Sequence, residues 1–217
     1  MKADSLNIIE IFASVQGETT LVGLPTTFVR LAACNLRCVW CDTTYSFGRG
    51  TPKTLEDILS IVRANGCKCV CVTGGEPLLQ DNVIPLMKQL CDEGYLVSIE
   101  TSGSLPTDAI DPRVRVILDI KCPGSGMESK NHWQNISYLR AHDEVKFVVA
   151  DKTDYEYAKE ISYKHSLWDK TNSVLFSPVY GQLDPKDLVN WILEDKLPVR
   201  INMQIHKMIW TPETQGV

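Results

Sequence analysis

The chain has 217 residues, 44% of them hydrophobic and 23% charged, so it can bury one sizeable core and we expect a single domain over residues 1–217. Its net charge of -5 argues against broad electrostatic binding of nucleic acid. No apolar run approaches the roughly 18 to 20 residues that cross a bilayer. Because the opening MKADSLNIIEIF also lacks the layout of a signal peptide, we expect a cytoplasmic protein with no membrane partner.

Runs rich in β-branched residues alternate with amphipathic helical patterns. The expected strands are 26–32, 69–73, 95–101, 114–120, 144–150, 173–179 and 199–204. The expected helices are one with Leu55, Ile58, Leu59 and Val62 on a single face, one over about 154–164, and one with Leu188, Val189, Trp191 and Ile192. Thr54 with Asp57 forms a capping pair for the first, and Asp184 with Pro185 begins the last. This βαβα order predicts an α/β fold whose ligands collect at the carboxyl ends of a mostly parallel sheet.

Three of the eight cysteines, Cys34, Cys38 and Cys41, fall in the long loop between the first expected strand and the first expected helix. A structural zinc site needs a fourth ligand, which this loop does not supply. A disulfide leaves an odd cysteine and suits an oxidising compartment better. A 4Fe-4S cluster held by three thiolates keeps one iron open for another ligand, and this is the interpretation that we favour.

The spacing Cys34-x3-Cys38-x2-Cys41, with Trp40 before the last cysteine and VTGGEPLLQ at 72–80, resembles the radical S-adenosylmethionine superfamily. The resemblance implies a partial TIM-like βα barrel in which the open iron binds S-adenosylmethionine. With few helices available after the fourth strand, we expect the barrel to be incomplete and its open side to accept a second subunit, giving a homodimer. The residues implied around S-adenosylmethionine are Trp40, Cys41, Asp42, Gly75, Asp119, Ile120, Lys121, Ser177, Pro178, Val179 and Tyr180.

Four further stretches, FASVQGETT (12–20), GLPTTFVRL (23–31), CDT (41–43) and HKMIW (206–210), are similar to the 7-carboxy-7-deazaguanine synthase family of queuosine biosynthesis. The resemblance implies a lyase that contracts the ring of 6-carboxy-5,6,7,8-tetrahydropterin with loss of ammonia, using Mg²⁺ at Thr43 and an external electron donor such as a flavodoxin. The planar fork of Arg30 suits the substrate carboxylate, and Glu18 suits its NH groups. The implied substrate residues are Val15, Gln16, Gly17, Glu18, Arg30, Thr73, Gln204 and His206.

Other interpretations stay open. A glycyl-radical activase would share the cluster but would not need Gln16, Glu18 or Arg30, and a zinc-binding interaction module would use the cysteines with a remote ligand. Arg30 could be a surface charge on an edge strand, Thr43 a turn cap, and Asp119 with Lys121 an ion pair. We assign the remaining cysteines, Cys67, Cys69, Cys71, Cys91 and Cys122, to packing.

The sequence departs from the family pattern in two places. Thr19 stands where the family often has glycine, and TPETQGV continues past Trp210.

Overall fold

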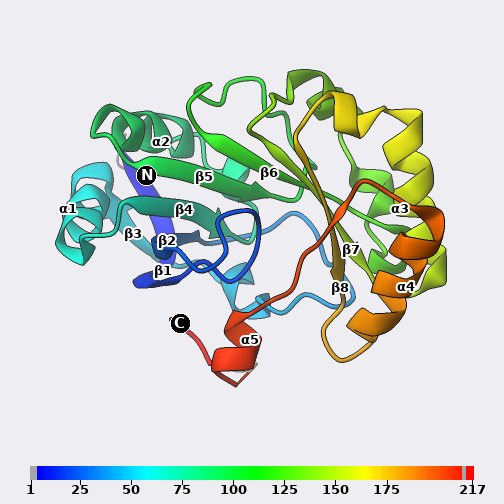
Figure 1. The fold of residues 1–217 in the computed structure, drawn as a ribbon. Helices are drawn as coiled ribbons and strands as arrows, with labels where there is room; N and C mark the ends of the chain where they lie inside the picture. Colours follow the sequence, from blue (N-terminus) through cyan, green and yellow to red (C-terminus); the bar gives the residue numbers. More distant parts are fainter. Residues whose placement is uncertain (1–3, 212–213) are drawn as a thin grey trace.

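The computed structural model describes residues 4–211 and 214–217, and within them nine strands form one sheet of order β3-β1-β2-β4-β5-β6-β7-β8-β9 (Figure 1). All neighbouring pairs from β2 to β9 are parallel, whereas β1 runs antiparallel to both β2 and β3. Because β3 and β9 end the sheet without pairing to each other, the barrel is open, which confirms the expected partial barrel. The strands are β1 (Ser5–Val15), β2 (Pro25–Leu31), β3 (Thr51–Thr54), β4 (Cys69–Gly74), β5 (Leu96–Thr101), β6 (Arg115–Ile120), β7 (Glu144–Val149), β8 (Ser173–Pro178) and β9 (Arg200–Ile201).

The helices of the described residues are α1 (Leu55–Asn65), α2 (Val83–Asp92), α3 (Lys152–Lys164), α4 (Pro185–Asp195) and α5 (His206–Ile209). The predicted helix starts are confirmed: Thr54 and Asp57 form a reciprocal capping box, and Asp184 caps α4 with Pro185 in its first turn. The sequence did not indicate β1, β3, α2 or α5, and β9 is shorter than the predicted strand 199–204. None of the described helices is long and apolar enough to cross a bilayer.

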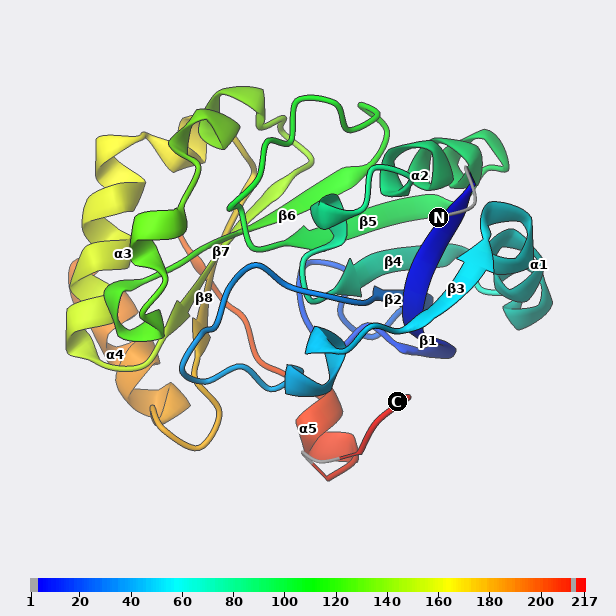
Figure 2. The same ribbon diagram turned by 180° about the vertical axis from the view of Figure 1, so that it is seen from behind.

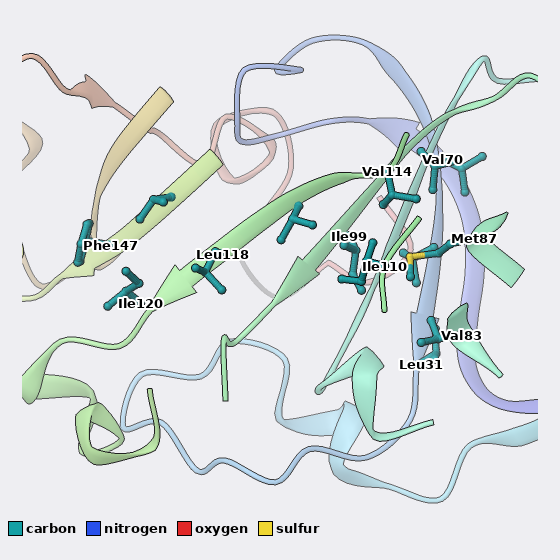
Figure 3. Packing of buried hydrophobic residues seen from close by; sticks show 14 of the residues in the cluster. Leu31, Val70, Val83, Met87, Ile99, Ile110, Val114, Leu118, Ile120 and Phe147 are labelled. Atoms are coloured by element: carbon teal, nitrogen blue, oxygen red, sulfur yellow. The ribbon is translucent and has the colours of Figure 1, made fainter. Parts of the chain in front are cut away.

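The hydrophobic core fills the space between the sheet and its helices. Figures 1 and 2 show α1 and α2 beside the β4 and β5 side of the sheet, and α3 and α4 beside β7 and β8. In Figure 3, Val83 of α2 lies beside Leu31 of β2, and Met87 of α2 lies toward Ile99 of β5. Because successive side chains of a strand point to opposite faces, the polar residues of these strands lie on the face away from the helices. The cavity described below is on that face.

Candidate active site

A cavity of about 890 Å³ opens where the parallel strands end, between the loop that follows β2 and helix α5. The loop after β2 runs toward the β6 end, where the backbone N of Val39 donates to the carbonyl oxygen of Ser125 at 3.1 Å (Figure 2). Ile120 lies outside the lining because its side chain packs in the hydrophobic core. The other predicted site residues all line the cavity: Val15, Gln16, Gly17, Glu18, Arg30, Cys34, Cys38, Trp40, Cys41, Asp42, Thr43, Thr73, Gly75, Asp119, Lys121, Ser177, Pro178, Val179, Tyr180, Gln204 and His206.

The three loop cysteines are free and half-buried at one side of this cavity. The backbone N of Leu36 donates to Sγ of Cys34 at 3.4 Å, a type of bond that tunes the sulfurs of iron–sulfur sites. Within residues 4–211 and 214–217, no three His, Cys, Asp or Glu side chains lie close enough to hold a single metal ion. A 4Fe-4S cube keeps its thiolates farther apart than one zinc ion does, so the loop fits a cluster better than mononuclear zinc.

The GGEP turn is packed directly against the cysteine loop. A Cβ on Gly75 would lie 2.1 Å from the carbonyl oxygen of Ala33 and 2.7 Å from Cβ of Cys34, so only glycine fits there. Glu76 is fully buried and accepts hydrogen bonds from the backbone N of Ser102 at 2.8 Å and from Oγ1 of Thr101 at 2.9 Å. This glutamate therefore ties the turn to the end of β5, while the two glycines line the cavity.

Asp119 presents an acceptor without a hydrogen-bond partner on the β6 side of the cavity. Its Oδ1 is buried and accepts no hydrogen bond, although Nζ of Lys121 lies 3.1 Å away. Lys121 therefore attracts the carboxylate electrostatically, while Oδ1 stays without a hydrogen-bond partner among the described residues. The predicted ion pair is therefore present, but it leaves an oxygen that the hydroxyl of a ribose could satisfy.

The first motif and the last helix meet at the cavity. Nε2 of Gln16 is buried without a partner, while its Oε1 accepts from the backbone N of Glu18 at 3.2 Å. A Cβ on Gly17 would fall 2.1 Å from Nδ1 of His206. The cavity thus holds a free amide donor beside an acidic acceptor, and a planar heterocycle with polar edges needs such a pair.

Arg30 is an interior charge rather than a charge on a surface edge. Its strand β2 lies between β1 and β4, its side chain is 16% exposed, and its Nε donates to Oε1 of Glu10 at 2.7 Å. Burial alone would lower the pKa of Arg30, yet Tyr45 and Glu10 raise it above the ordinary value. Thr73 stands opposite Arg30 in the β2–β4 register and donates from Oγ1 to Oε2 of Glu100 at 3.0 Å.

Comparisons with known proteins agree with this geometry. The Radical SAM superfamily model matches residues 29–123. A 7-carboxy-7-deazaguanine synthase of Koribacter versatilis (strain Ellin345) is 45% identical over 98% of this chain and 100% of that protein. Another from Chlorobaculum tepidum is 46% identical over 98% of this chain and 97% of that protein. The chain belongs to the 7-carboxy-7-deazaguanine synthase family.

The fold agrees with that membership. The crystal structure of QueE from Escherichia coli matches with a TM-score of 0.76 and 24% identity, over 92% of this chain and 94% of that chain. As a 7-carboxy-7-deazaguanine synthase family member, the protein is a radical S-adenosylmethionine lyase, whose cofactors are a 4Fe-4S cluster and S-adenosylmethionine. Membership decides against both the glycyl-radical activase and the zinc-binding module.

In this family member, Thr43 occupies the N-cap position of a 3-10 turn (Thr44–Phe47), but its side chain makes no capping hydrogen bond. Its Oγ1 instead donates to Oδ1 of Asp42 at 2.9 Å. Oδ2 of Asp42 accepts from Nζ of Lys207 at 2.7 Å. Burial would raise the pKa of Asp42, but Lys207 outweighs that effect and holds it well below its ordinary range. An ionised carboxylate beside a hydroxyl is a suitable neighbourhood for Mg²⁺.

Thr19 adopts a left-handed backbone conformation at the position where the family pattern led us to expect glycine. Its φ is +68°, in the left-handed region that a β-branched residue rarely occupies. The backbone N of Thr19 donates to Oδ1 of Asn202 at 2.7 Å, and its Oγ1 accepts from the backbone N of Leu21 at 3.1 Å. The substrate loop therefore keeps the shape that glycine would give it, at some conformational strain.

Sequence reasoning missed three groups that line the same cavity. Lys146 of β7 lies 3.2 Å from Glu18 and 3.6 Å from Asp119, measured between Nζ and carboxylate oxygens. Glu100 of β5 accepts from Thr73 as described above, and residues 214–217 close one side. The signal for the first two is a charged residue inside an otherwise apolar strand, as in EVKFVVA and LVSIET. Of the tail TPETQGV, Pro212 and Glu213 lie outside the described residues.

Proposed function

We propose that the protein catalyses the ring contraction of 6-carboxy-5,6,7,8-tetrahydropterin to 7-carboxy-7-deazaguanine, with loss of ammonia, in queuosine biosynthesis. The observation that carries this proposal is that Gln16, Glu18 and Arg30 line the same cavity as the three cysteines of the cluster loop. When bound, the cluster, which Cys34, Cys38 and Cys41 would hold, and S-adenosylmethionine would supply the radical chemistry for hydrogen abstraction at C6 of the pterin.

The chain's own residues hold the pterin for that step. Arg30 keeps its guanidinium charged and fixed through Glu10, and its fork grips the carboxylate of the substrate. Nε2 of Gln16 donates to the pterin edge, which satisfies an otherwise unpaired buried group. Glu18 accepts from the guanidine-like NH groups. Three polar contacts around a planar ring fix the orientation that places C6 toward the S-adenosylmethionine side.

On that side, the backbone of Gly75 and the carboxylate of Asp119 receive S-adenosylmethionine. Gly75 leaves its backbone open to the amino group, because no side chain covers it and Cys34 lies directly behind. Oδ1 of Asp119, which accepts no hydrogen bond from the described residues, accepts from a ribose hydroxyl. The Thr43 hydroxyl, with the ionised Asp42 next to it, would hold Mg²⁺.

The proposal extends to partners and location. Val39, next to Cys38, is 77% exposed, so an external electron donor such as a flavodoxin can approach this edge of the cluster loop. Met208 and Ile209 on α5 are 74% and 57% exposed, and with the open side of the barrel they support a homodimer. One continuous hydrophobic cluster supports a single domain over residues 1–217. All eight cysteines are free, as is usual in a reducing compartment, and this supports a cytoplasmic location.

One anaerobic reaction tests the proposed function. Reconstituted protein, a reductant, S-adenosylmethionine, Mg²⁺ and 6-carboxytetrahydropterin are combined, and the products are identified by mass spectrometry. We expect 7-carboxy-7-deazaguanine together with 5'-deoxyadenosine. Formation of 5'-deoxyadenosine alone, in protein shown to contain iron and sulfide, would assign another substrate.

A further inference from the structure

Lys146 lies on the cavity wall between residues that we assign to two different ligands. Its Nζ is 3.2 Å from Oε2 of Glu18, on the substrate side, and 3.6 Å from Oδ2 of Asp119, on the S-adenosylmethionine side. Its side chain is only 12% exposed. We propose that Lys146 is a positioning residue whose ammonium group holds the carboxylate of Glu18 in the orientation that receives the NH groups of the substrate. This inference rests on the proposed function.

Lys146 acts as a fixed charge. Burial would favour the neutral amine, but Glu18 and Asp119, with a smaller effect from Glu100, raise the pKa of Lys146 well above its ordinary value. The ammonium therefore persists at neutral pH and is not available as a general base or a nucleophile. What Lys146 contributes is a positive charge of fixed position in a largely buried site, where such a charge interacts strongly with its neighbours.

The contacts of Glu18 show what that charge does. Oε1 accepts from Nε2 of Gln204 at 2.8 Å, whereas Oε2 faces Lys146 and accepts from Nδ2 of Asn202 at 3.3 Å. Burial raises the pKa of Glu18, but Lys146 is the strongest of the influences that bring it below its ordinary value. An ionised carboxylate only accepts hydrogen bonds, and its two oxygens have capacity left for the substrate. Without Lys146, burial would raise the pKa of Glu18 with less opposition, and Oε2 would lose the partner that fixes its orientation toward the NH groups of the substrate.

A different role predicts a different result. If Lys146 instead bound the substrate carboxylate directly, removing it would cost the same affinity whether or not residue 18 is charged. If it acts through Glu18, removing it costs little once Glu18 has become glutamine. A double-mutant cycle measures this difference.

The experiment compares Lys146→Met, Glu18→Gln and the double variant with the reconstituted wild-type protein. Binding of 6-carboxytetrahydropterin is measured by anaerobic calorimetry without S-adenosylmethionine, so that no turnover occurs, and KM and kcat are measured separately. We expect Lys146→Met alone to weaken binding by roughly 10- to 100-fold, the size of a lost hydrogen bond to a charged group. In the Glu18→Gln background the same change should cost less than about threefold. Lys146→Arg should recover most of the affinity, because it retains the charge.

Two further variants keep the test decisive. Lys170→Met removes an exposed lysine outside the cavity and should leave binding unchanged. Lys146→Gln keeps a hydrogen-bond donor at this position. It replaces Lys146→Met in the double-mutant cycle if loss of the buried charge prevents Lys146→Met from folding. Equal losses of affinity in the two backgrounds, or full affinity in Lys146→Met, would overturn the inference. If the inference about Lys146 fails but the wild-type protein still forms 7-carboxy-7-deazaguanine, the proposed function stands. If the wild-type protein forms no 7-carboxy-7-deazaguanine, the proposed function itself is refuted.

Discussion

Gly17 and His206 are in such close contact that a Cβ on the glycine would fall 2.1 Å from Nδ1 of the histidine. The backbone N of Ile205 also donates to the carbonyl oxygen of Gly17 at 2.9 Å. The two contacts join the loop after β1 to the start of α5, although the residues are far apart in the sequence. Helix α5 and the loop after β1 thereby form one wall of the cavity.

Gly17→Ala should therefore displace His206 and open that wall. We expect the affinity for 6-carboxytetrahydropterin to fall at least tenfold with a smaller effect on the melting temperature, because the new methyl meets one side chain at the cavity rather than the core. Calorimetric titration measures the affinity. Gly48→Ala is the matched control, since its Cβ would meet only the carbonyl oxygen of Tyr45 at 3.6 Å. Equal affinities in Gly17→Ala and wild type would contradict the packing described here.

The cysteines should separate into cluster ligands and packing residues. Cys38→Ala removes a thiolate of the loop, so iron and acid-labile sulfide should be largely lost after anaerobic reconstitution, along with the visible absorption of the cluster. Cys71→Ala removes a fully buried thiol whose pKa burial raises well above its ordinary value. It should keep the full iron content and lose only about 1 kcal/mol of stability. Loss of iron in Cys71→Ala would contradict this division.

Arg30→Lys keeps a positive charge but loses the fork that grips a carboxylate in two places. We expect the binding of 6-carboxytetrahydropterin to weaken by roughly 10- to 100-fold. Binding of tetrahydropterin without the carboxylate should barely change, because it makes no contact that the substitution removes. Arg113→Lys, which changes an exposed arginine paired with Asp111, is the control. A similar loss for both ligands would indicate that Arg30 supports the fold and does not bind the carboxylate.

Asn202→Ala should destabilise the substrate loop. Asn202 is 5% exposed, and it accepts from the backbone N of Thr19 at 2.7 Å and donates to Oγ of Ser177 at 2.8 Å. Its removal leaves a buried backbone donor unpaired, so we expect the free energy of unfolding to fall by about 2 kcal/mol in urea titrations. Asn172→Ala changes an exposed side chain and should stay within about 0.5 kcal/mol of wild type.

The pH dependence of stability should carry a contribution from His206. Burial lowers the pKa of His206 in the folded protein, outweighing Glu18 and Asp42, which raise it, while Lys207 lowers it further. The unfolded chain then takes up the proton first as the pH falls. The contribution of neutral His206 to the free energy of unfolding is therefore fully present above about pH 6.5, and it is lost as the pH falls below that value.

His206→Gln should therefore show a shallower fall in the free energy of unfolding between about pH 7 and pH 5 than wild type. Urea titrations at a series of pH values measure the two slopes. His165, whose pKa burial also lowers, is present in both proteins and contributes equally to each. Identical slopes would contradict the role assigned to His206.

Local patterns predicted the parts of the fold that depend on local contacts. The capping box at Thr54 and the start of α4 at Asp184 depend on contacts within one helical turn. The sequence also predicted the cysteine loop, because all three thiols fall within one short stretch. β1 was missed because Asn7 and Glu10 interrupt its apolar pattern, and its regularity comes from pairing with both β2 and β3.

The missed site residues required knowledge of which strands are neighbours. Lys146 and Asp119 lie opposite each other in the β6–β7 register, which no single stretch of sequence reveals. Glu18 reaches Lys146 only because the loop after β1 folds over the strand ends. Ile120 shows the converse limit: it lies between two cavity residues, yet strand alternation turns its side chain into the core.

Transfer of a single hydrogen tests the central claim most directly. The anaerobic reaction is run with 6-carboxytetrahydropterin carrying deuterium at C6, and the mass of the 5'-deoxyadenosine is measured. If the cavity holds the pterin with C6 toward the S-adenosylmethionine side, one deuterium should appear in the 5'-deoxyadenosine that accompanies 7-carboxy-7-deazaguanine. If the 5'-deoxyadenosine formed alongside that product contains no deuterium, the result would contradict the orientation that Gln16, Glu18 and Arg30 are proposed to impose.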